Sequence, residues 1–315
     1  MATTEQVHPE ILRNRLRTAT ASRSLQRARE RVIEILLLLA ALSSVAITVG
    51  IVGILVFESL QFFKHVSIVE FLTDTQWTVL FADPHYGIMP LVSGTLVTSV
   101  IALLVSLPLG TIIAIYLSEY ANTRTREILK PILELLSAVP TVVFGYFALL
   151  FLTPLLQRFL PSLPGFNMLS AGIVIGIMII PYVSSLSEDA IRAVPVHIRE
   201  GSYAMGATRL QTALRVLFPA AFSGIASAYV LGFSRAVGET MIVAVAAGVQ
   251  PNLTLNPMEG AATITAYIVQ VSLGDLPHGS IAYQSIFAAG LTLMLMTLLF
   301  NIGGYLLRKR FREIY

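Results

Sequence analysis

Long apolar runs alternate with short polar intervals along most of the chain. Six runs are long enough to cross a bilayer, because a hydrocarbon layer of about 30 Å takes roughly 20 helical residues. They cover residues 32–57, 90–117, 131–155, 168–186, 219–247 and 283–307. The pattern predicts an all-α integral membrane protein with six transmembrane helices.

The composition supports this prediction. Hydrophobic residues make up 55% of the 315 residues and charged residues only 12%, whereas soluble domains contain about 25% charged residues. The chain has no cysteine, which excludes disulfides and cysteine-bound metals.

The basic residues are distributed very unevenly. Of the 21 Lys and Arg residues, 18 lie in residues 1–31, 118–130, 187–218 and 308–315, which the six spans place on one side of the membrane. The positive-inside rule makes this side cytoplasmic, so both termini are predicted to be cytoplasmic and residues 58–89 extracytoplasmic. The Arg-rich tail 1–31 is either a partly disordered topogenic segment, which is the simpler interpretation, or an amphipathic helix on the inner leaflet.

The polar interval EGSYAMGATRLQTALRVLFP, residues 200–219, separates two apolar runs on the cytoplasmic side. Gly206 can turn the chain between two short helices, because glycine has no Cβ penalty at positive φ. The small residues near Tyr203 and Met205 leave these two side chains free to enter a groove in a partner. An ordinary amphipathic loop is the alternative interpretation.

The spacing of Glu200, Gly206, Val216 and Phe218-Pro219 resembles the "EAA…G…I-LP" loop of ABC importer permeases. The sequence departs from that motif at Gly201 and Ser202, where the motif has alanines, although both residues are small. The resemblance implies that residues 187–218 form a cytoplasmic coupling loop that docks on a separate ATPase subunit. The residues expected to couple are Glu200, Gly201, Ser202, Tyr203, Ala204, Met205, Gly206 and Pro219.

Arg235 and Glu239 lie inside the fifth apolar run. Charges at membrane depth are costly and normally face a protein interior or a water-filled pathway. Their spacing of four places them on one face of a continuous helix. We expect a role in translocation, since the guanidinium is a natural partner of an oxyanion; the alternative is an Arg–Glu pair that only locks helices together.

No pattern for catalysis or metal binding is present in the sequence. There is no P-loop, and the five histidines are scattered. Glu188-Asp189 follows the fourth run and is expected to solvate a loop or to pair with Arg192. We therefore expect a conduit with no catalytic residue, no metal and no cofactor of its own.

Two segments, SAVPTVVFGYFAL (137–149) and SRAVGETMIVAVAAG (234–248), together with the loop at Glu200, resemble the C-type permease subunits of Pst phosphate importers. The resemblance covers about residues 90–307 and implies a type I ABC importer permease (MetI-like) fold. It implies a five-helix core at 90–307 and a peripheral first helix at 32–57. Arg235 and Glu239 match the charged positions implicated in phosphate movement, and Pro140 and Thr141 lie in the other matching segment, where Pro140 is expected to break a helix near the pathway.

The resemblance also implies the partners. They are a second, homologous permease forming a heterodimer, a dimer of ATPase subunits that holds ATP-Mg, an extracytoplasmic phosphate-binding protein and the lipid bilayer of a bacterial inner membrane, with no nucleic acid. Two alternatives stay open at this point. One is an importer for another oxyanion, and the other is an ion-coupled secondary transporter, although the chain lacks the matched broken helices of inverted repeats.

Overall fold

The computed structural model describes residues 9–79, 81–274 and 276–310. The chain divides into two compact units, Met1–Leu55 and Val56–Tyr315. Helix α1 (Pro9–Phe62) makes up the described part of the first unit. Its last residues, 56–62, belong to the second unit. Because α1 is helical from Pro9, residues 9–31 continue the apolar helix, and the expectation of a partly disordered tail is wrong for them. Residues 1–8 lie outside the described residues.

The second unit is helical, and its described residues form no strand beyond one antiparallel bridge between Trp77 and Tyr86. Its helices are α2 (Ile68–Thr73), α3 (Met89–Ile115), α4 (Thr123–Ser137), α5 (Thr141–Phe147), α6 (Thr153–Gln157), α7 (Met168–Arg192), α8 (Val196–Ala204), α9 (Arg209–Thr212), α10 (Phe218–Ala220), α11 (Phe222–Val237), α12 (Met241–Ala246), α13 (Ile264–Ser272) and α14 (Ile281–Arg310). Three π-helical turns join some of them: η1 (Tyr116–Tyr120), η2 (Ala148–Leu152) and η3 (Ala213–Leu217).

The six predicted spans correspond to four continuous helices and two bent pairs. Within the described residues, the segments Arg29–Phe62, Met89–Tyr120, Met168–Arg192 and Ile281–Leu306 are each long and apolar enough to cross a membrane. The third span is bent by 86° between Thr123–Ser137 and Thr141–Gln157, and the segment leading into the fifth is bent by 75° between Arg209–Ala220 and Phe222–Val237. The all-helical membrane fold is therefore confirmed, with bends that hydropathy does not indicate.

Proline explains the first bend. Pro140 has φ −56° and ψ 133° and precedes the first residue of α5. A proline disfavours the helical conformation of the residue before it, here Val139, so α4 ends before the ring. The predicted break at Pro140 is confirmed. The loop expected at 118–130 is instead mostly helical, because α4 begins at Thr123, where the Asn122 side chain accepts a hydrogen bond from the Thr125 N–H.

Helices α3 and α7 pack closely at the centre of the second unit. A Cβ at Gly172 would lie 2.6 Å from the Ile101 side chain, and one at Gly176 would lie 2.7 Å from Val105. Small residues let membrane helices approach in this way, where lipid offers no hydrophobic driving force between them. The core extends from this contact to residues of α11, α12 and α13.

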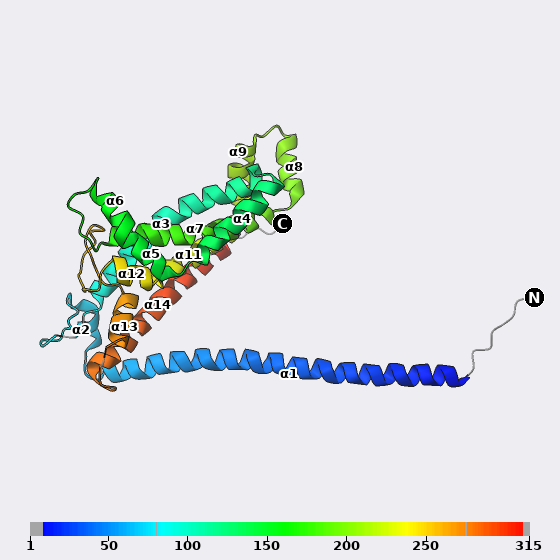
Figure 1. Cartoon of the computed structure of the whole chain (residues 1–315), viewed down its shortest axis with the longest axis horizontal. Helices are drawn as coiled ribbons and strands as arrows, with labels where there is room; N and C mark the ends of the chain where they lie inside the picture. Colours follow the sequence, from blue (N-terminus) through cyan, green and yellow to red (C-terminus); the bar gives the residue numbers. More distant parts are fainter. Residues whose placement is uncertain (1–8, 80, 275, 311–315) are drawn as a thin grey trace, which may run out of the picture. The chain divides into compact units, whose positions relative to one another are not determined.

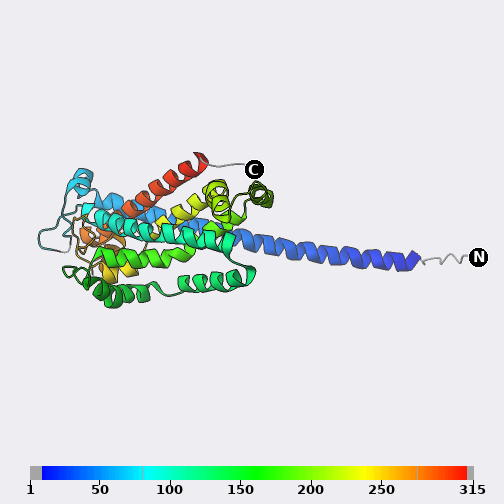
Figure 2. The same cartoon turned by 90° about the horizontal axis from the view of Figure 1, so that it is seen from above.

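The α8–α9 hairpin and the long loops lie at opposite ends of the second unit (Figure 1). In Figure 1, α8 and α9 lie at one end of α3 and α7, whereas α2, α6 and α13 lie toward the other. The view from above again shows the yellow-green hairpin at one end of the unit and the connecting loops at the other (Figure 2). We call these the α8 end and the α13 end. The short helices at the α13 end include α2 and α13.

Candidate functional site

The segment expected to couple to an ATPase forms a helical hairpin. Helix α8 covers Val196–Ala204, and α9 begins at Arg209. Between them Gly206 has a φ of +81°, the conformation that its place between two helices predicted. The Thr208 side chain and Gln211 form a capping box at the start of α9, which stabilises this short helix. A short helix at Glu200 is therefore confirmed, while its contact with an ATPase stays a prediction.

Three polar contacts fix the hairpin. The hydroxyls of Ser202 and Thr212 lie 2.8 Å apart and join α8 to α9. Glu119 lies in η1, directly after α3. Its side chain is almost completely buried and forms an ion pair with Arg199 of α8, Oε1 to Nη2 2.9 Å. The Tyr203 hydroxyl donates to Glu119 Oε2 at 3.2 Å. Burial, together with the nearby Glu119 charge, raises the pKa of Tyr203 and keeps this donor protonated.

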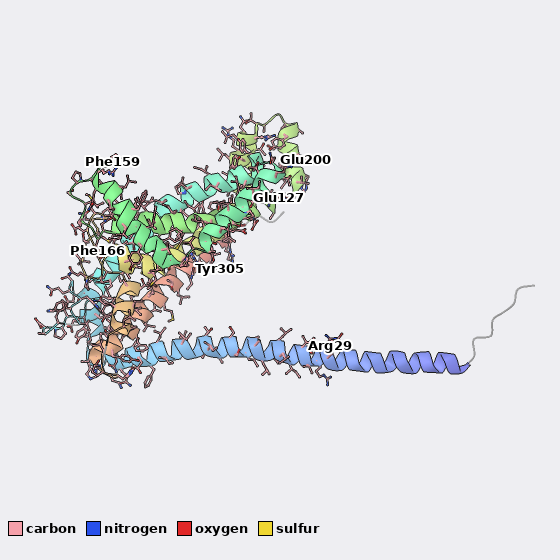
Figure 3. All side chains as sticks on the ribbon, in the orientation of Figure 1. Arg29, Glu127, Phe159, Phe166, Glu200 and Tyr305 are labelled. Carbon is pink, nitrogen blue, oxygen red and sulfur yellow. The ribbon has the colours of Figure 1, made fainter. Side chains whose placement is uncertain are left out.

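The outward side of the hairpin is unobstructed in the isolated chain. Glu200, Gly201, Ala204 and Pro219 are exposed, and Met205 is 89% exposed, which is unusual for a large apolar side chain. Figure 3 shows Glu200 at the α8 end, on the same side as Glu127 of α4 and far from Phe159 and Phe166. A rigid hairpin that presents small residues and a methionine is suited to docking into a groove.

Arg235 lies in the last turn of α11 and is half-buried. Its guanidinium carbon is 4.5 Å from the centre of the Tyr182 ring of α7, a cation–π contact. Its Nε is buried and has no hydrogen-bond partner. The guanidinium therefore lies against an aromatic face, and its Nε–H donor is unused.

Glu239 does not share a helix face with Arg235, contrary to the sequence prediction. Helix α11 ends at Val237 and α12 begins at Met241, so the i,i+4 rule does not apply across the break. The Glu239 carboxylate accepts the Met241 and Ile242 N–H groups at 3.1 and 3.3 Å. Among the ion pairs of the described residues, none joins Glu239 to Arg235, so the geometry gives no support to the Arg–Glu lock.

Pro140 and Thr141 are connected to this region through α12. Thr141 is the first residue of α5. A Cβ on Gly145 of α5 would lie 3.2 Å from the Met241 carbonyl oxygen. Helix α5 therefore packs on the helix that Glu239 caps, and the bend at Pro140 fixes the direction from which it approaches.

Glu188 is the charged residue that sequence reasoning misplaced. The expected ion pair with Arg192 is confirmed, but the expectation of a solvated carboxylate is wrong, because α7 continues to Arg192 and the Glu188 side chain is completely buried. Its main partners are Arg126 and Lys130 of α4, with Arg192 more distant at 3.9 Å. The spacing of four between Arg126 and Lys130 was the only available signal, since it places two cations on one helix face.

The sequence of the chain matches that of known membrane transport components. Residues 106–313 match the family described as "Binding-protein-dependent transport system inner membrane component". The chain belongs to this family. It is 37% identical to a probable ABC transporter permease protein, YqgH, of Bacillus subtilis over 91% of this chain and 92% of that protein. It is 34% identical to the phosphate transport system permease protein PstC 1 of Mycobacterium tuberculosis, covering 70% and 71% of the two chains.

A further relative is the probable phosphate transport system permease protein PstC of Methanocaldococcus jannaschii, 31% identical over 84% of this chain and 88% of that one. Among solved structures, a chain of a bacterial alginate ABC transporter has a TM-score of 0.63 at 19% identity, covering 87% of this chain and 94% of that chain. A chain of the MetNI methionine ABC transporter gives 0.53 at 18% identity, with 72% and 95% covered. These likenesses confirm the ABC importer permease fold.

Family membership decides several expectations. The chain is a multi-pass membrane protein and a transport component rather than an enzyme. An ion-coupled secondary transporter is thereby ruled out. The family description itself includes a substrate-binding protein, which makes such a partner part of the system.

Proposed function

We propose that this chain is the transmembrane permease subunit of an ATP-driven phosphate importer and forms half of its translocation pathway. Several relatives with 30% identity or more are named as phosphate transport permeases. The observation that supports the proposal at the level of atoms is the half-buried Arg235, whose Nε–H donor is unused beside the break between α11 and α12.

The chemistry of phosphate suits this arrangement. Phosphate is a hydrated anion at neutral pH, and hydrocarbon offers no substitute for its water. The planar fork of Arg235 supplies charge and directed N–H donors. The Tyr182 ring orients the guanidinium without using those donors in a hydrogen-bonded ion pair. Phosphate must also leave the site, so Arg235 must not bind it too tightly. Because the guanidinium also contacts the Tyr182 ring, it binds the anion less tightly than a guanidinium without that contact would.

Glu239 serves the same region through the backbone. Its carboxylate caps α12, and its carbonyl accepts the Thr265 hydroxyl at 2.7 Å. In our proposal it fixes the broken helix beside Arg235 and adds a negative charge that limits anion binding. Pro140 and Thr141 belong to the pathway through the packing of α5 on α12.

The hairpin at Glu200 provides the coupling. We infer that Glu200–Gly206 docks on one subunit of an ATPase dimer that binds ATP-Mg, and that Met205 enters a groove there. A second, homologous permease completes the pathway as a heterodimer, and an extracytoplasmic phosphate-binding protein delivers the anion. These assignments place the α8 end and both termini in the cytoplasm, in agreement with the distribution of basic residues.

Uptake of radiolabelled phosphate by cells that express variants tests the proposal. Arg235→Gln is expected to reduce uptake by about 100-fold or more, since it removes the charge and the fork, an interaction worth about 3 kcal/mol. Arg235→Lys retains the charge but not the fork and is expected to give intermediate uptake. Glu239→Gln should reduce uptake less than Arg235→Gln, because an amide oxygen can still cap α12.

Arg158→Gln, at the end of α6, is the matched control and should transport normally. Membrane levels of every variant are measured by immunoblot, and an excess of unlabelled sulfate in parallel samples tests the alternative of another oxyanion. Normal uptake by Arg235→Gln at normal membrane levels would contradict the pathway role. Uptake that sulfate abolishes and phosphate does not would contradict the substrate.

A further inference from the structure

The cluster around Glu188 joins α4 to α7 through ion pairs. Glu188 Oε1 accepts a hydrogen bond from Arg126 Nε, and Lys130 Nζ lies 2.9 Å from Oε2 and 2.8 Å from Asp189 Oδ1. The side chains of Arg126 and Lys130 are themselves mostly buried, with 27% and 22% exposed. A completely buried carboxylate is stable only while its cations remain in place, since removing one partner leaves an uncompensated charge.

Helix α4 depends on this cluster for its position. None of its side chains is buried. Near its end Leu136 packs against the core, and so does Val139 beyond it, so that part is fixed by apolar contacts. The half that contains Arg126 and Lys130 is held to α7 by the ion pairs with Glu188 and Asp189. Charged contacts of this kind can exchange between discrete arrangements more readily than an interlocked apolar core.

The cluster lies between the two parts of the candidate site. On one side, α7 ends four residues after Glu188 and leads through Pro195 into α8. On the other side, α4 passes through the 86° bend into α5. Helix α5 packs by Gly145 on α12. The contacts thus run without interruption from the hairpin to the helix that Glu239 caps.

We propose that Glu188 is the positioning residue that locks α4 to α7, so that movement of the α8–α9 hairpin is transmitted through α4 and α5 to the region of Arg235 and Glu239. This inference rests on the proposed function, because it assumes that the hairpin receives the movement of an ATPase. It assigns to Glu188 no contact with phosphate. Loss of the lock should therefore separate ATP hydrolysis from transport and should not alter the affinity of the pathway.

The test uses the complete transporter, purified with its partner subunits and reconstituted in liposomes. Phosphate uptake and ATP hydrolysis are measured on the same samples. For Glu188→Gln we expect phosphate moved per ATP hydrolysed to fall about tenfold, within the range of ordinary coupling energies, while the complex remains assembled. Glu134→Gln, an exposed carboxylate on α4, is the matched control and should retain the wild-type ratio.

A distance measurement supplies a readout that a merely structural role would not change. The chain has no cysteine, so spin labels can be attached to Glu127→Cys on α4 and Phe159→Cys at the α13 end, both exposed (Figure 3). We expect the distance between the labels to change on ATP binding in the wild type and to stay constant in Glu188→Gln. The conservative variant Glu188→Asp, which keeps the carboxylate among its cations, should retain part of the ATP-dependent change.

The possible outcomes are distinct. Uptake and hydrolysis that fall together, in proportion to the amount of assembled complex, would overturn the inference, and so would an unchanged ratio. If Glu188→Gln does not assemble, Arg126→Gln with its exposed neighbour Glu127→Gln as control decides the question in the same assay. A wild-type complex that shows no ATP-dependent phosphate uptake would instead overturn the proposed function.

Discussion

The two ends of the helical unit are stabilised by different kinds of contact. At the α13 end the contacts are aromatic: the Trp77 ring lies 5.0 Å from that of Tyr267 and 6.1 Å from that of Phe71, both edge to face. At the α8 end ion pairs accompany a smaller apolar cluster that includes Ile191 and Leu217. Glu119 is paired to Arg199, and Glu188 is paired to Arg126 and Lys130. Backbone hydrogen bonds reinforce the first end, for example from Met168 N–H to the Glu259 carbonyl at 3.0 Å.

This difference indicates which end can change its arrangement. Interlocked rings lose many contacts at once when they separate, so rearranging an aromatic cluster costs much free energy. Buried ion pairs contribute little net stability but require a defined geometry, and two such geometries can have similar energies. We infer that the α13 end is the fixed part of this unit and that the α8 end is the part that responds to a partner.

The largest expected effect comes from breaking the aromatic end. Trp77 is 2% exposed, and Trp77→Ala should destabilise the fold by about 3–5 kcal/mol, since it leaves a cavity among rings. Thermal unfolding of the purified protein in detergent should show a clearly lower midpoint. Trp77→Phe retains a ring and is the control, with a smaller loss. An unchanged midpoint for Trp77→Ala would contradict the distinction between the two ends.

An intermediate effect is expected from straining the hairpin at the α8 end. Gly206 has φ +81° with open space around it, so Gly206→Val meets no clash but forces a β-branched residue into the left-handed region. The local cost is about 1–3 kcal/mol. We expect normal membrane insertion with reduced phosphate uptake per ATP hydrolysed. Gly201→Ala, in a helical and open position, is the control. Coupling equal to wild type in Gly206→Val would show that this turn is not needed.

The smallest effect on stability is expected from the titration of His85. Its hydrogen bond to Asp74 is a polar contact at the aromatic end, so it tests whether polar contacts matter there as well. The hydrogen bond to Asp74 raises the pKa of His85 above 6.5. The pKa of Asp74 is lowered: burial raises it, but the hydrogen bonds from His85 and from the Gln76 N–H outweigh burial. The contribution of His85 to stability is therefore fully present below pH 6.5 and is lost as the pH rises through its raised folded pKa.

The midpoint of thermal unfolding should accordingly be slightly lower at pH 8.5 than at pH 6. His85→Gln should remove most of that difference, because an amide does not titrate. The free-energy change behind this shift of the midpoint should be smaller than the local cost of Gly206→Val, because the imidazole is exposed and its charge is screened by solvent. A pH dependence that persists unchanged in His85→Gln would show that other groups cause it.

The sequence alone determined the membrane class, the approximate positions of the four continuous apolar helices and the turn at Gly206. These depend on composition and on local rules: an apolar run of sufficient length must be helical in lipid, and glycine permits positive φ. The break at Pro140 was predictable for the same reason, because proline restricts its own neighbourhood whatever packs around it. The angle of 86° was not, because it depends on what α4 and α5 pack against.

Only the tertiary structure decided the environment of the charges. Arg235 and Glu239 are four residues apart, but the break after Val237 gives one an aromatic partner and the other a helix end to cap. The burial of Glu188 was not evident from the sequence because its two nearest cations, Arg126 and Lys130, lie more than fifty residues away along the chain. Whether a charge in a membrane protein is buried depends on which distant helix supplies its counter-ion, and no local pattern encodes that choice.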